Sequence, residues 1–184
     1  MAENHEETAP IRQRASRQVH KTPWLGVRED TVEFADGRQS PYTVIECGHC
    51  VGVLPLTDDG NVLMVRQYRY IAGRYTWEMP TGGVRLGEPY EQAAQRELAE
   101  EAGHHARELL HVSTYHTSKS SIDETAHLYI GRGLTPASAA QDDDEDVEYT
   151  PIPFAQVLQM VLSGEITDSM TIIAVLHAVR MGLA

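Results

Sequence analysis

Long apolar runs are missing from this sequence, and their absence excludes a conventional membrane-spanning helix. Such a helix needs about 18 or more apolar residues in a row, and no stretch approaches that length. The opening residues MAENHEETAPIRQRASRQ also lack the apolar core of a secretory signal peptide. We therefore expect a cytoplasmic protein that does not bind membranes.

Basic residues are also scarce: 15 lysines and arginines stand against 27 aspartates and glutamates, which gives a net charge of -12. A field of this sign repels the phosphates of nucleic acids and of anionic membranes, so we expect neither as a partner. The 184 residues, 41% of them hydrophobic, suffice for one domain with a buried core and are too few for two full-sized domains.

Cysteine occurs only at Cys47 and Cys50, in IECGHCVGV. The spacing matches a dithiol redox motif, but a reactive pair of that kind sits at the start of a helix, where the dipole lowers the thiol pKa. The surrounding YTVIECGHCVGVLPL is β-branched and indicates a strand interrupted by a turn. A zinc site would need two further ligands, and there is no second cysteine pair. We interpret both cysteines as thiols without a catalytic role.

Changes of pattern along the chain predict three segments. Residues 1–20 are polar and aperiodic, so we expect a flexible tail. Residues 21–46 alternate apolar and polar positions and predict a small N-terminal β-meander, a subdomain or dimerisation element. Residues 47–184 form the main domain, with strands in CVGVLPL, NVLMVRQYRY and TWEMP followed by a glycine-rich loop.

A helix is predicted over residues 89–102, since its proline suits the first helical position and Gly103 suits the left-handed position that ends a helix. At about 100° per residue, Glu97 and Glu101 lie nearly in line, with Glu100 beside them. Like charges at this spacing repel one another, and a hard divalent cation such as Mg²⁺ or Mn²⁺ would relieve the repulsion. The alternative is an ordinary solvated face, which charge-rich helices commonly have.

The residues around this helix favour the metal site. Residues 82–104 fit G-x5-E-x7-R-E-U-x-E-E-x-G-U, in which U is bulky and apolar, at every position except the last. The fixed positions are Gly82, Glu88, Arg96, Glu97, Leu98, Glu100, Glu101 and Gly103. The segment resembles the signature of the Nudix hydrolases. His104 is the departure, because it stands where the family has an aliphatic residue.

The flanking sequence is similar to the ADP-ribose and nucleoside-diphosphate-sugar pyrophosphatase branch of that family, in VRQYRYIAGRYTWEMPTGG and in DDEDVEYTPIPFAQVLQMVLSGEITDSMTIIAVL. The resemblance implies an α/β/α sandwich with a mixed sheet, in a homodimer whose N-terminal strands help to build the partner's site. It implies metal-dependent hydrolysis of the diphosphate linkage of ADP-ribose or a related nucleoside diphosphate sugar, giving a nucleoside monophosphate and a sugar phosphate. The final segments FAQVLQMVLSG and DSMTIIAVLHAVRMG read as amphipathic helices, the second capped by Asp168.

The predicted ligands of Mg²⁺ (or Mn²⁺) are Glu97, Glu100 and Glu101, and Glu101 is also assigned to catalysis. The resemblance adds the backbone carbonyl of Thr81. A metal ion held there would neutralise charge on the diphosphate and activate a water molecule.

Arg96 is the second catalytic candidate, although on a helical wheel it faces away from the metal. We expect it to hold Glu88 or Glu100 through a charge-assisted hydrogen bond and so to orient the loop. Glu88 is alternatively an acidic first-turn residue of the kind that helix N-termini favour.

The general base is expected in QDDDEDVEY, because the related enzymes use a glutamate of a late acidic loop. Aligned on the strand that follows, Glu145 is the first choice, with Asp143 and Glu148 behind it. The alternative is that these consecutive acids are a solvated loop tip.

Five residues are candidate substrate contacts. By resemblance, Arg69 meets the phosphates, with Arg66 as a second choice, and Trp24 from the neighbouring subunit stacks on the base. Glu78 and Glu124 can accept hydrogen bonds from the ribose or the base. The alternatives are an ordinary strand surface for the arginines and a core or interface role for the tryptophan.

One loop departs from the branch: HTSKSSIDE, with Lys119, stands where ADP-ribose-type members carry a proline. ADP-glucose and GDP-mannose are therefore open alternatives to ADP-ribose. A catalytically silent nucleotide-binding or sensor module is a second alternative, although such domains commonly lose signature glutamates and none is lost here. A carboxylate-bridged iron site in a helical bundle is excluded, because strand patterns flank the helix and no Glu-x-x-His pair occurs.

Overall fold

The computed structural model describes residues 9–137 and 148–183. Two of the three candidates for the general base, Glu145 and Asp143, lie outside these residues. Within them, no helix is long and apolar enough to cross a membrane.

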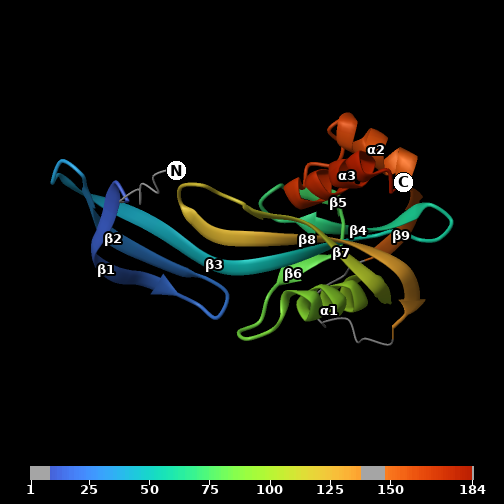
Figure 1. The fold of residues 1–184 in the computed structure, drawn as a ribbon, viewed down its shortest axis with the longest axis horizontal. Helices are drawn as coiled ribbons and strands as arrows, with labels where there is room; N and C mark the ends of the chain where they lie inside the picture. Colours follow the sequence, from blue (N-terminus) through green and yellow to red (C-terminus); the bar gives the residue numbers. More distant parts are fainter. Residues whose placement is uncertain (1–8, 138–147, 184) are drawn as a thin grey trace, which may run out of the picture. The chain divides into compact units, whose positions relative to one another are not determined.

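Nine strands and three helices make up the described part of the chain (Figure 1). The strands are β1 (Ile11–Lys21), β2 (Gly26–Phe34), β3 (Gln39–Pro55), β4 (Asn61–Arg69), β5 (Arg74–Glu78), β6 (Thr81–Gly83), β7 (His104–His116), β8 (Ile122–Pro136) and β9 (Glu148–Pro153). The helices are α1 (Tyr90–Ala102), α2 (Phe154–Leu162) and α3 (Ser169–Met181).

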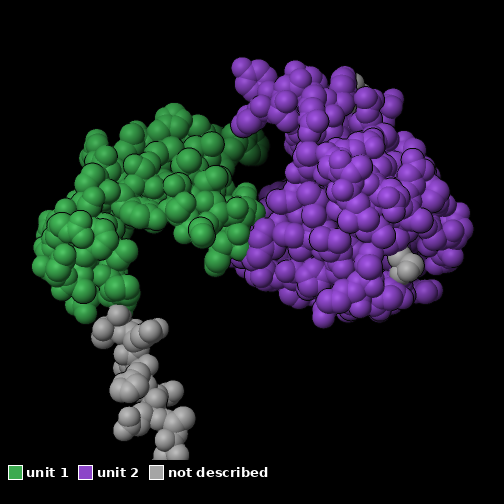
Figure 2. All heavy atoms as spheres, turned by 90° about the horizontal axis from the view of Figure 1, so that it is seen from above, with its two compact units in different colours: residues 1–48, 116–124 green, residues 49–115, 125–184 purple. Residues whose placement is uncertain are grey.

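The chain divides into two compact units, residues 1–48 with 116–124 and residues 49–115 with 125–184 (Figure 2). The first unit contains the antiparallel meander of β1, β2 and the first half of β3. Cys47 and Cys50 both lie in β3, as the strand pattern predicts, and form no disulfide bond. The turn expected within this segment is wrong, because β3 runs without interruption from Gln39 to Pro55.

The flexible tail expected for residues 1–20 is wrong from Ile11 onward, where β1 begins. All residues of β1 are exposed, so the strand carries no apolar alternation that a sequence pattern could reveal. It is held by its backbone ladder to β2 and by cross-strand ion pairs such as Arg17 with Glu29, which face each other in the register.

The main sheet is mixed, as expected. Its strand order is β1-β2-β3-β8-β7, with β6 paired to β3, and a second sheet has the order β5-β4-β9. The amide of Ile45 donates to the Ser121 carbonyl and that of Leu56 to the Gly131 carbonyl, so β3 and β8 run in the same direction. The pairings of β6 with β3 and of β4 with both neighbours are antiparallel.

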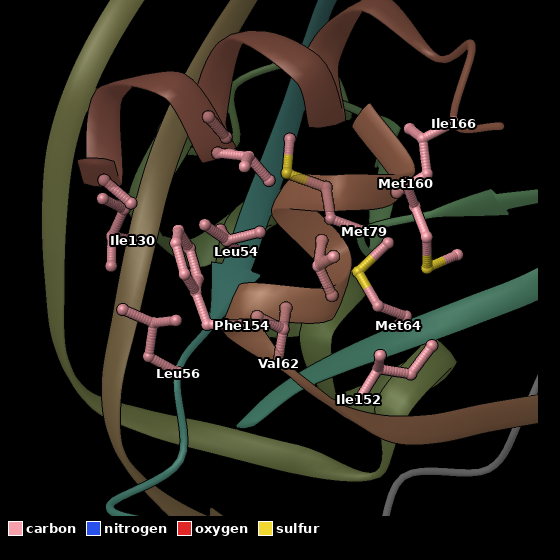
Figure 3. Close-up of a cluster of buried hydrophobic side chains, with 14 of the residues drawn as sticks. Leu54, Leu56, Val62, Met64, Met79, Ile130, Ile152, Phe154, Met160 and Ile166 are labelled. Carbon is pink, nitrogen blue, oxygen red and sulfur yellow. The ribbon is translucent and has the colours of Figure 1, made fainter. Parts of the chain in front are cut away.

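The second unit is layered, with helices on both faces of its strands. One core joins α2 and α3 to the alternate positions Leu54, Met64 and Ile130 (Figure 3). The other joins α1 to the intervening positions, among them Val53 and Leu63. Because successive strand residues point to opposite faces, this alternation gives the expected α/β/α sandwich.

The ends of the helices follow the local sequence signals. Pro89 precedes α1 as its N-cap, and Gly103 ends the helix with a φ of 62°. Asp168 caps α3 by accepting a hydrogen bond from the amide of Thr171, as predicted. The expected helix of residues 89–102 is thus confirmed to within one residue.

Candidate active site

Helix α1 holds the predicted metal ligands at the edge of its buried face. Leu98 and Ala102 are fully buried and fix the rotation of the helix about its axis. Glu97 and Glu101 are consequently only 9% and 4% exposed, whereas Glu100 is half-buried. The carboxylates lie neither in bulk water nor in dry core, as expected.

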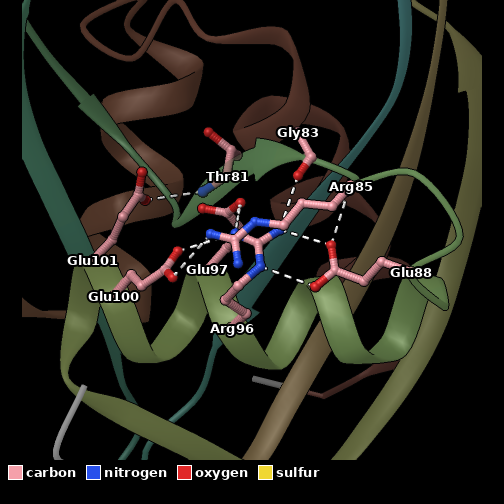
Figure 4. Close-up of polar contacts among 8 residues, drawn as sticks. All are labelled: Thr81, Gly83, Arg85, Glu88, Arg96, Glu97, Glu100 and Glu101. Carbon is pink, nitrogen blue, oxygen red and sulfur yellow. Dashed lines mark hydrogen bonds and ion pairs between the residues drawn. The ribbon is translucent and has the colours of Figure 1, made fainter. Parts of the chain in front are cut away.

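Arg96 connects the acidic residues of the site (Figure 4). Its guanidinium forms a two-pronged contact with Glu88, in which Nε donates to Oε1 and Nη2 to Oε2, each at 2.9 Å. Nη1 donates to Glu97 and, over 3.0 Å, to Glu100, while Nη2 also donates to the Gly83 carbonyl at 2.9 Å. The expected contact with Glu88 or Glu100 is thus present with both.

The expectation that Arg96 faces away from the predicted metal ligands is wrong. The helical wheel gives the direction of a Cα–Cβ bond, but the long arginine side chain bends back and places its guanidinium against Glu97 and Glu100. The pKa of Arg96 is raised chiefly by its hydrogen bonds to Glu88, against the effect of burial, with smaller contributions from Glu97 and Glu100. The pKa of Glu88 falls to about 2, because Arg96 donates to its carboxylate, against the opposing effect of burial, and the amide of Arg85 also donates to it.

Gly82 allows strand β6 to approach the carboxylate of Glu97. A Cβ atom added at Gly82 would lie 2.1 Å from Cδ and 2.3 Å from both oxygens of Glu97. At Gly83, the next residue, an added Cβ would meet nothing within 4 Å. The first glycine of the signature is therefore needed for space, because the backbone of β6 lies directly against a predicted metal ligand.

Thr81 lies beside Glu101, since its amide donates to Oε2 of Glu101 over 2.9 Å. The donor set of three carboxylates and a backbone carbonyl suits a hard divalent cation. Within residues 9–137 and 148–183, however, no three His, Cys, Asp or Glu side chains are arranged as they stand to hold a metal ion. Arg96 holds two of the carboxylates and Thr81 the third, so convergence on an ion would exchange some of these contacts for metal bonds.

The sequence as a whole was compared with known families and proteins. A family model described as NUDIX domain matches residues 48–168. This chain belongs to the NUDIX family. A second model, described as Nucleoside diphosphate sugar hydrolase N-terminal domain, matches residues 11–45 of this Nudix chain, which include β1 and the meander.

Several Nudix relatives match over most of this chain. It is 33% identical to an ADP-ribose pyrophosphatase of Mycobacterium tuberculosis over 100% of this chain and 89% of the relative. It is 31% identical to an ADP-ribose pyrophosphatase of Bacillus subtilis over 88% of each chain. The crystal structure of an ADP compounds hydrolase superposes with a TM-score of 0.82 at 21% identity, covering 95% of each chain, which shows the shared fold.

Arg69 and Glu78 form a pair in the second unit of this Nudix fold. Nε of Arg69 donates to Oε1 of Glu78 at 2.9 Å, Nη2 donates to Oε2, and the Thr76 hydroxyl also donates to Glu78. Burial raises the pKa of Glu78, but the hydrogen bonds from Arg69 and Thr76 outweigh it, so that the pKa lies below its ordinary value. Glu78 is 5% exposed. The predicted role of Glu78 as an acceptor for the ribose or the base remains a prediction.

Arg69 is electrostatically linked to the carboxylates of α1. Its pKa is raised chiefly by the hydrogen bonds to Glu78, against burial, and further by the negative charges of Glu101 and Asp168. Arg69 is therefore in contact with Glu78 and within electrostatic reach of Glu101 and Asp168.

The remaining candidates are placed individually. Arg66 lies over the rings of Tyr75 and Trp77, with its Cζ 4.6 Å and 5.8 Å from their centroids, as a strand-surface residue would. Trp24 is 86% exposed in the first unit, where Glu124 is half-buried. The roles assigned to these three residues remain predictions.

Two features near the site were not predicted. Nη2 of Arg85 lies 3.6 Å from Oε1 of Glu100, and the amide of Arg85 donates to Glu88. The sequence offers one indication of these contacts, because Arg85 is a basic residue in the glycine-rich loop before the acidic helix. His104, the departure from the signature, hydrogen-bonds through Nδ1 to the Ala102 carbonyl at 2.6 Å and meets Tyr149 edge to face.

Proposed function

We propose that this Nudix hydrolase catalyses metal-dependent hydrolysis of the diphosphate linkage of ADP-ribose or a related nucleoside diphosphate sugar. Water adds to one phosphorus, the bridging P–O bond breaks, and the products are a nucleoside monophosphate and a sugar phosphate. The observation that carries the proposal is the carboxylate edge of α1, in which Gly82 gives room to Glu97 and Arg96 joins Glu88, Glu97 and Glu100. The match of the N-terminal segment to a nucleoside diphosphate sugar hydrolase model supports the substrate class.

Glu97, Glu100, Glu101 and the carbonyl of Thr81 would hold the metal, which we propose to be Mg²⁺ or Mn²⁺. Once bound, such an ion polarises phosphoryl oxygens and lowers the pKa of a coordinated water. Arg96 would orient Glu97 and Glu100 through the hydrogen bonds that it donates to both.

Arg69 is the proposed contact for the negatively charged diphosphate. A guanidinium presents donors in a fixed plane that matches phosphate oxygens. Glu78 and Thr76 hold this plane in position from the buried side, so Glu78 acts as a positioning residue. Arg66 is the second candidate for the phosphates.

The rest of the site is proposed from the resemblance alone. Glu145 is the proposed general base, with Asp143 and Glu148 as alternatives. Glu148 is exposed at the start of β9. Trp24 of a neighbouring subunit in a homodimer would stack on the base, and Glu124 would accept a hydrogen bond from ribose or base.

The test is a substrate panel with product identification. Purified protein is incubated with ADP-ribose, ADP-glucose, GDP-mannose and ATP, with Mg²⁺, with Mn²⁺ and with EDTA. We expect a nucleoside monophosphate and a sugar phosphate from at least one nucleotide sugar, only when metal is present. A preference for ADP-glucose or GDP-mannose would identify the sugar without changing the reaction. Tight binding of nucleotide without turnover would favour the sensor module instead.

A further inference from the structure

A cluster of histidines lies at the first residue of α1, apart from the carboxylates. The ring of Tyr90 stacks on the ring of His127 in β8, with centroids 3.8 Å apart and planes inclined by 19°. Nε2 of His127 lies 3.1 Å from Nδ1 of His49 in β3, and the Tyr90 hydroxyl lies 3.5 Å from the same Nδ1. Tyr90, His49 and His127 therefore form a compact triad that joins the helix to two neighbouring strands.

The triad continues as a hydrogen-bonded chain toward β7. Nδ1 of His127 lies 3.2 Å from Oγ1 of Thr114, which lies 2.9 Å from Nε2 of His111. His127 is 8% exposed, whereas His49 and His111 reach the surface. Burial lowers the pKa of His127, and the charges of His49 and His111 lower it further.

Titratable groups face His127 from three elements: His49 in β3, His111 in β7 and Tyr90 in α1. Next to them, Tyr129 of β8 meets His111 edge to face at 5.4 Å, and burial raises its pKa to about 12, with smaller contributions from Glu91 and Tyr90 of α1. Tyr129 is therefore uncharged at neutral pH and supplies no anion to stabilise a protonated imidazole.

The position of Tyr90 matters because α1 begins without a side-chain cap. Pro89, its N-cap residue, forms no capping side-chain hydrogen bond, and the preceding residues Arg85, Leu86 and Gly87 are exposed. Tyr90 packs against the apolar core beneath α1 and stacks on His127. Leu98 and Ala102 hold the middle and the end of the helix, and Tyr90 is the anchored ring at its first turn.

We propose that His49 and His127 form a pH-sensitive clamp on Tyr90, which positions the catalytic helix when His127 is neutral and releases it when both imidazoles are protonated. Both histidines act through their contacts with Tyr90, the first residue of the helix. The clamp extends the proposed function, but its closed and open states can be measured without any substrate.

Hydrogen-bond chemistry fixes the direction of the effect. When the two neutral imidazoles have taken up no further proton, or only one, one ring nitrogen can donate to the other across the 3.1 Å gap. A second proton leaves two N–H groups and two positive charges facing each other in a largely buried place, which is unfavourable. Because the folded state holds the pKa of His127 below the ordinary 6.5, the unfolded chain binds more protons, and stability falls as the pH drops below about 6.5.

The first experiment is an NMR titration of the full-length protein, with the imidazole signals, the Tyr90 ring and the Ala93 amide assigned. The Ala93 amide donates to the Pro89 carbonyl in the first turn of α1 and reports its integrity. We expect the second protonation of the pair below pH 6.5, with the Tyr90 ring signal shifting and the Ala93 amide losing protection from exchange in the same step. If the Tyr90 ring shift and the exchange protection of the Ala93 amide do not change at this protonation step, the clamp is refuted.

The second experiment compares His127→Phe, His49→Gln and the control His105→Gln, a surface histidine of β7 outside the cluster. Phenylalanine keeps a ring beneath Tyr90 but cannot titrate, and glutamine at position 49 removes one of the two charges. Between pH 7.5 and 5.5, the unfolding constant of the wild type should rise relative to His127→Phe by up to about tenfold, because pH 5.5 lies one unit below the ordinary pKa of 6.5.

Turnover provides a readout that a purely structural histidine would not change. The ratio of kcat for His127→Phe to kcat for wild type should rise as the pH falls from 7.5 to 5.5, His49→Gln should show a smaller rise, and His105→Gln should follow the wild type. Equal pH profiles for His127→Phe and wild type would refute the proposal. If no substrate is found, the proposed function fails, while the titration and the unfolding constants still decide for or against the clamp.

Discussion

Replacing Gly82 by alanine tests whether the carboxylate of Glu97 must lie against β6. The added Cβ would stand 2.1 Å from Cδ of Glu97, and ordinary van der Waals contact begins at 3.4 Å, so the carboxylate must retreat by about 1.3 Å. Glu97 is 9% exposed and bound to Arg96, which leaves few alternative positions for its side chain.

We expect this displacement to lower the catalytic rate more than it lowers the stability of the fold. A misplacement of about 1 Å in a catalytic group can cost about 10²-fold in rate, which corresponds to about 2.7 kcal/mol of barrier. We therefore expect Gly82→Ala to lower kcat about a hundredfold and to raise the metal concentration needed for half-maximal activity. The loss of stability should be near the worth of one charged hydrogen bond, about 1.5–3 kcal/mol. Steady-state kinetics over a metal titration and urea denaturation measure the two effects.

Gly83→Ala is the matched control, because an added Cβ at Gly83 meets nothing within 4 Å and leaves the carbonyl that Arg96 contacts in place. We expect its kcat and metal dependence to equal those of the wild type. Wild-type kinetics for Gly82→Ala, or equal losses in both alanine variants, would refute the steric explanation of the signature glycine.

Three further predictions address individual side chains. Glu101→Gln should reduce metal-dependent turnover by at least about 10²-fold, while the thermal midpoint of unfolding stays near that of the wild type. Full activity of this variant would show that Glu101 is not a metal ligand. Glu88 has a pKa of about 2, below its ordinary 4.5, so the stability that its pairing with Arg96 supplies is present above pH 4.5 and is lost as the pH falls toward 2. In urea denaturation, the free energy of unfolding of Glu88→Gln should therefore lie below that of the wild type at pH 6 and approach it at pH 2.5. A difference in this free energy that stays the same at both pH values would contradict the pairing. Arg69→Lys keeps the charge but loses the fork held by Glu78, so KM should rise about tenfold with a smaller change in kcat, and an unchanged KM would exclude Arg69 as the diphosphate contact.

Much of the fold could be predicted because local signals and packing agree. The helix formers, Pro89 and Gly103 mark α1, and the alternating apolar residues of β3 and β4 divide between two cores. Strand β1 could not be predicted, because a fully exposed strand has no apolar periodicity, and its pairing with β2 depends on long-range backbone bonds.

The site shows a similar division. Spacing on the helix placed Glu97 and Glu101 at the edge of the buried face, where the structure finds them. It misjudged Arg96, because five donors on a long side chain can reach partners that the direction of Cβ does not indicate. The contact between Glu78 and Arg69 could not be predicted, because it depends on the register of the paired strands β4 and β5.

Metal-dependent hydrolysis at the carboxylates of α1 is tested by a product analysis of nucleotide sugars incubated with wild-type protein or Glu101→Gln, with Mg²⁺ and with EDTA. For ADP-ribose, we expect equal amounts of AMP and ribose 5-phosphate from the wild type with metal, and almost none with EDTA or from the variant. Hydrolysis confined to nucleoside triphosphates, or hydrolysis that survives both EDTA and the loss of Glu101, would contradict it.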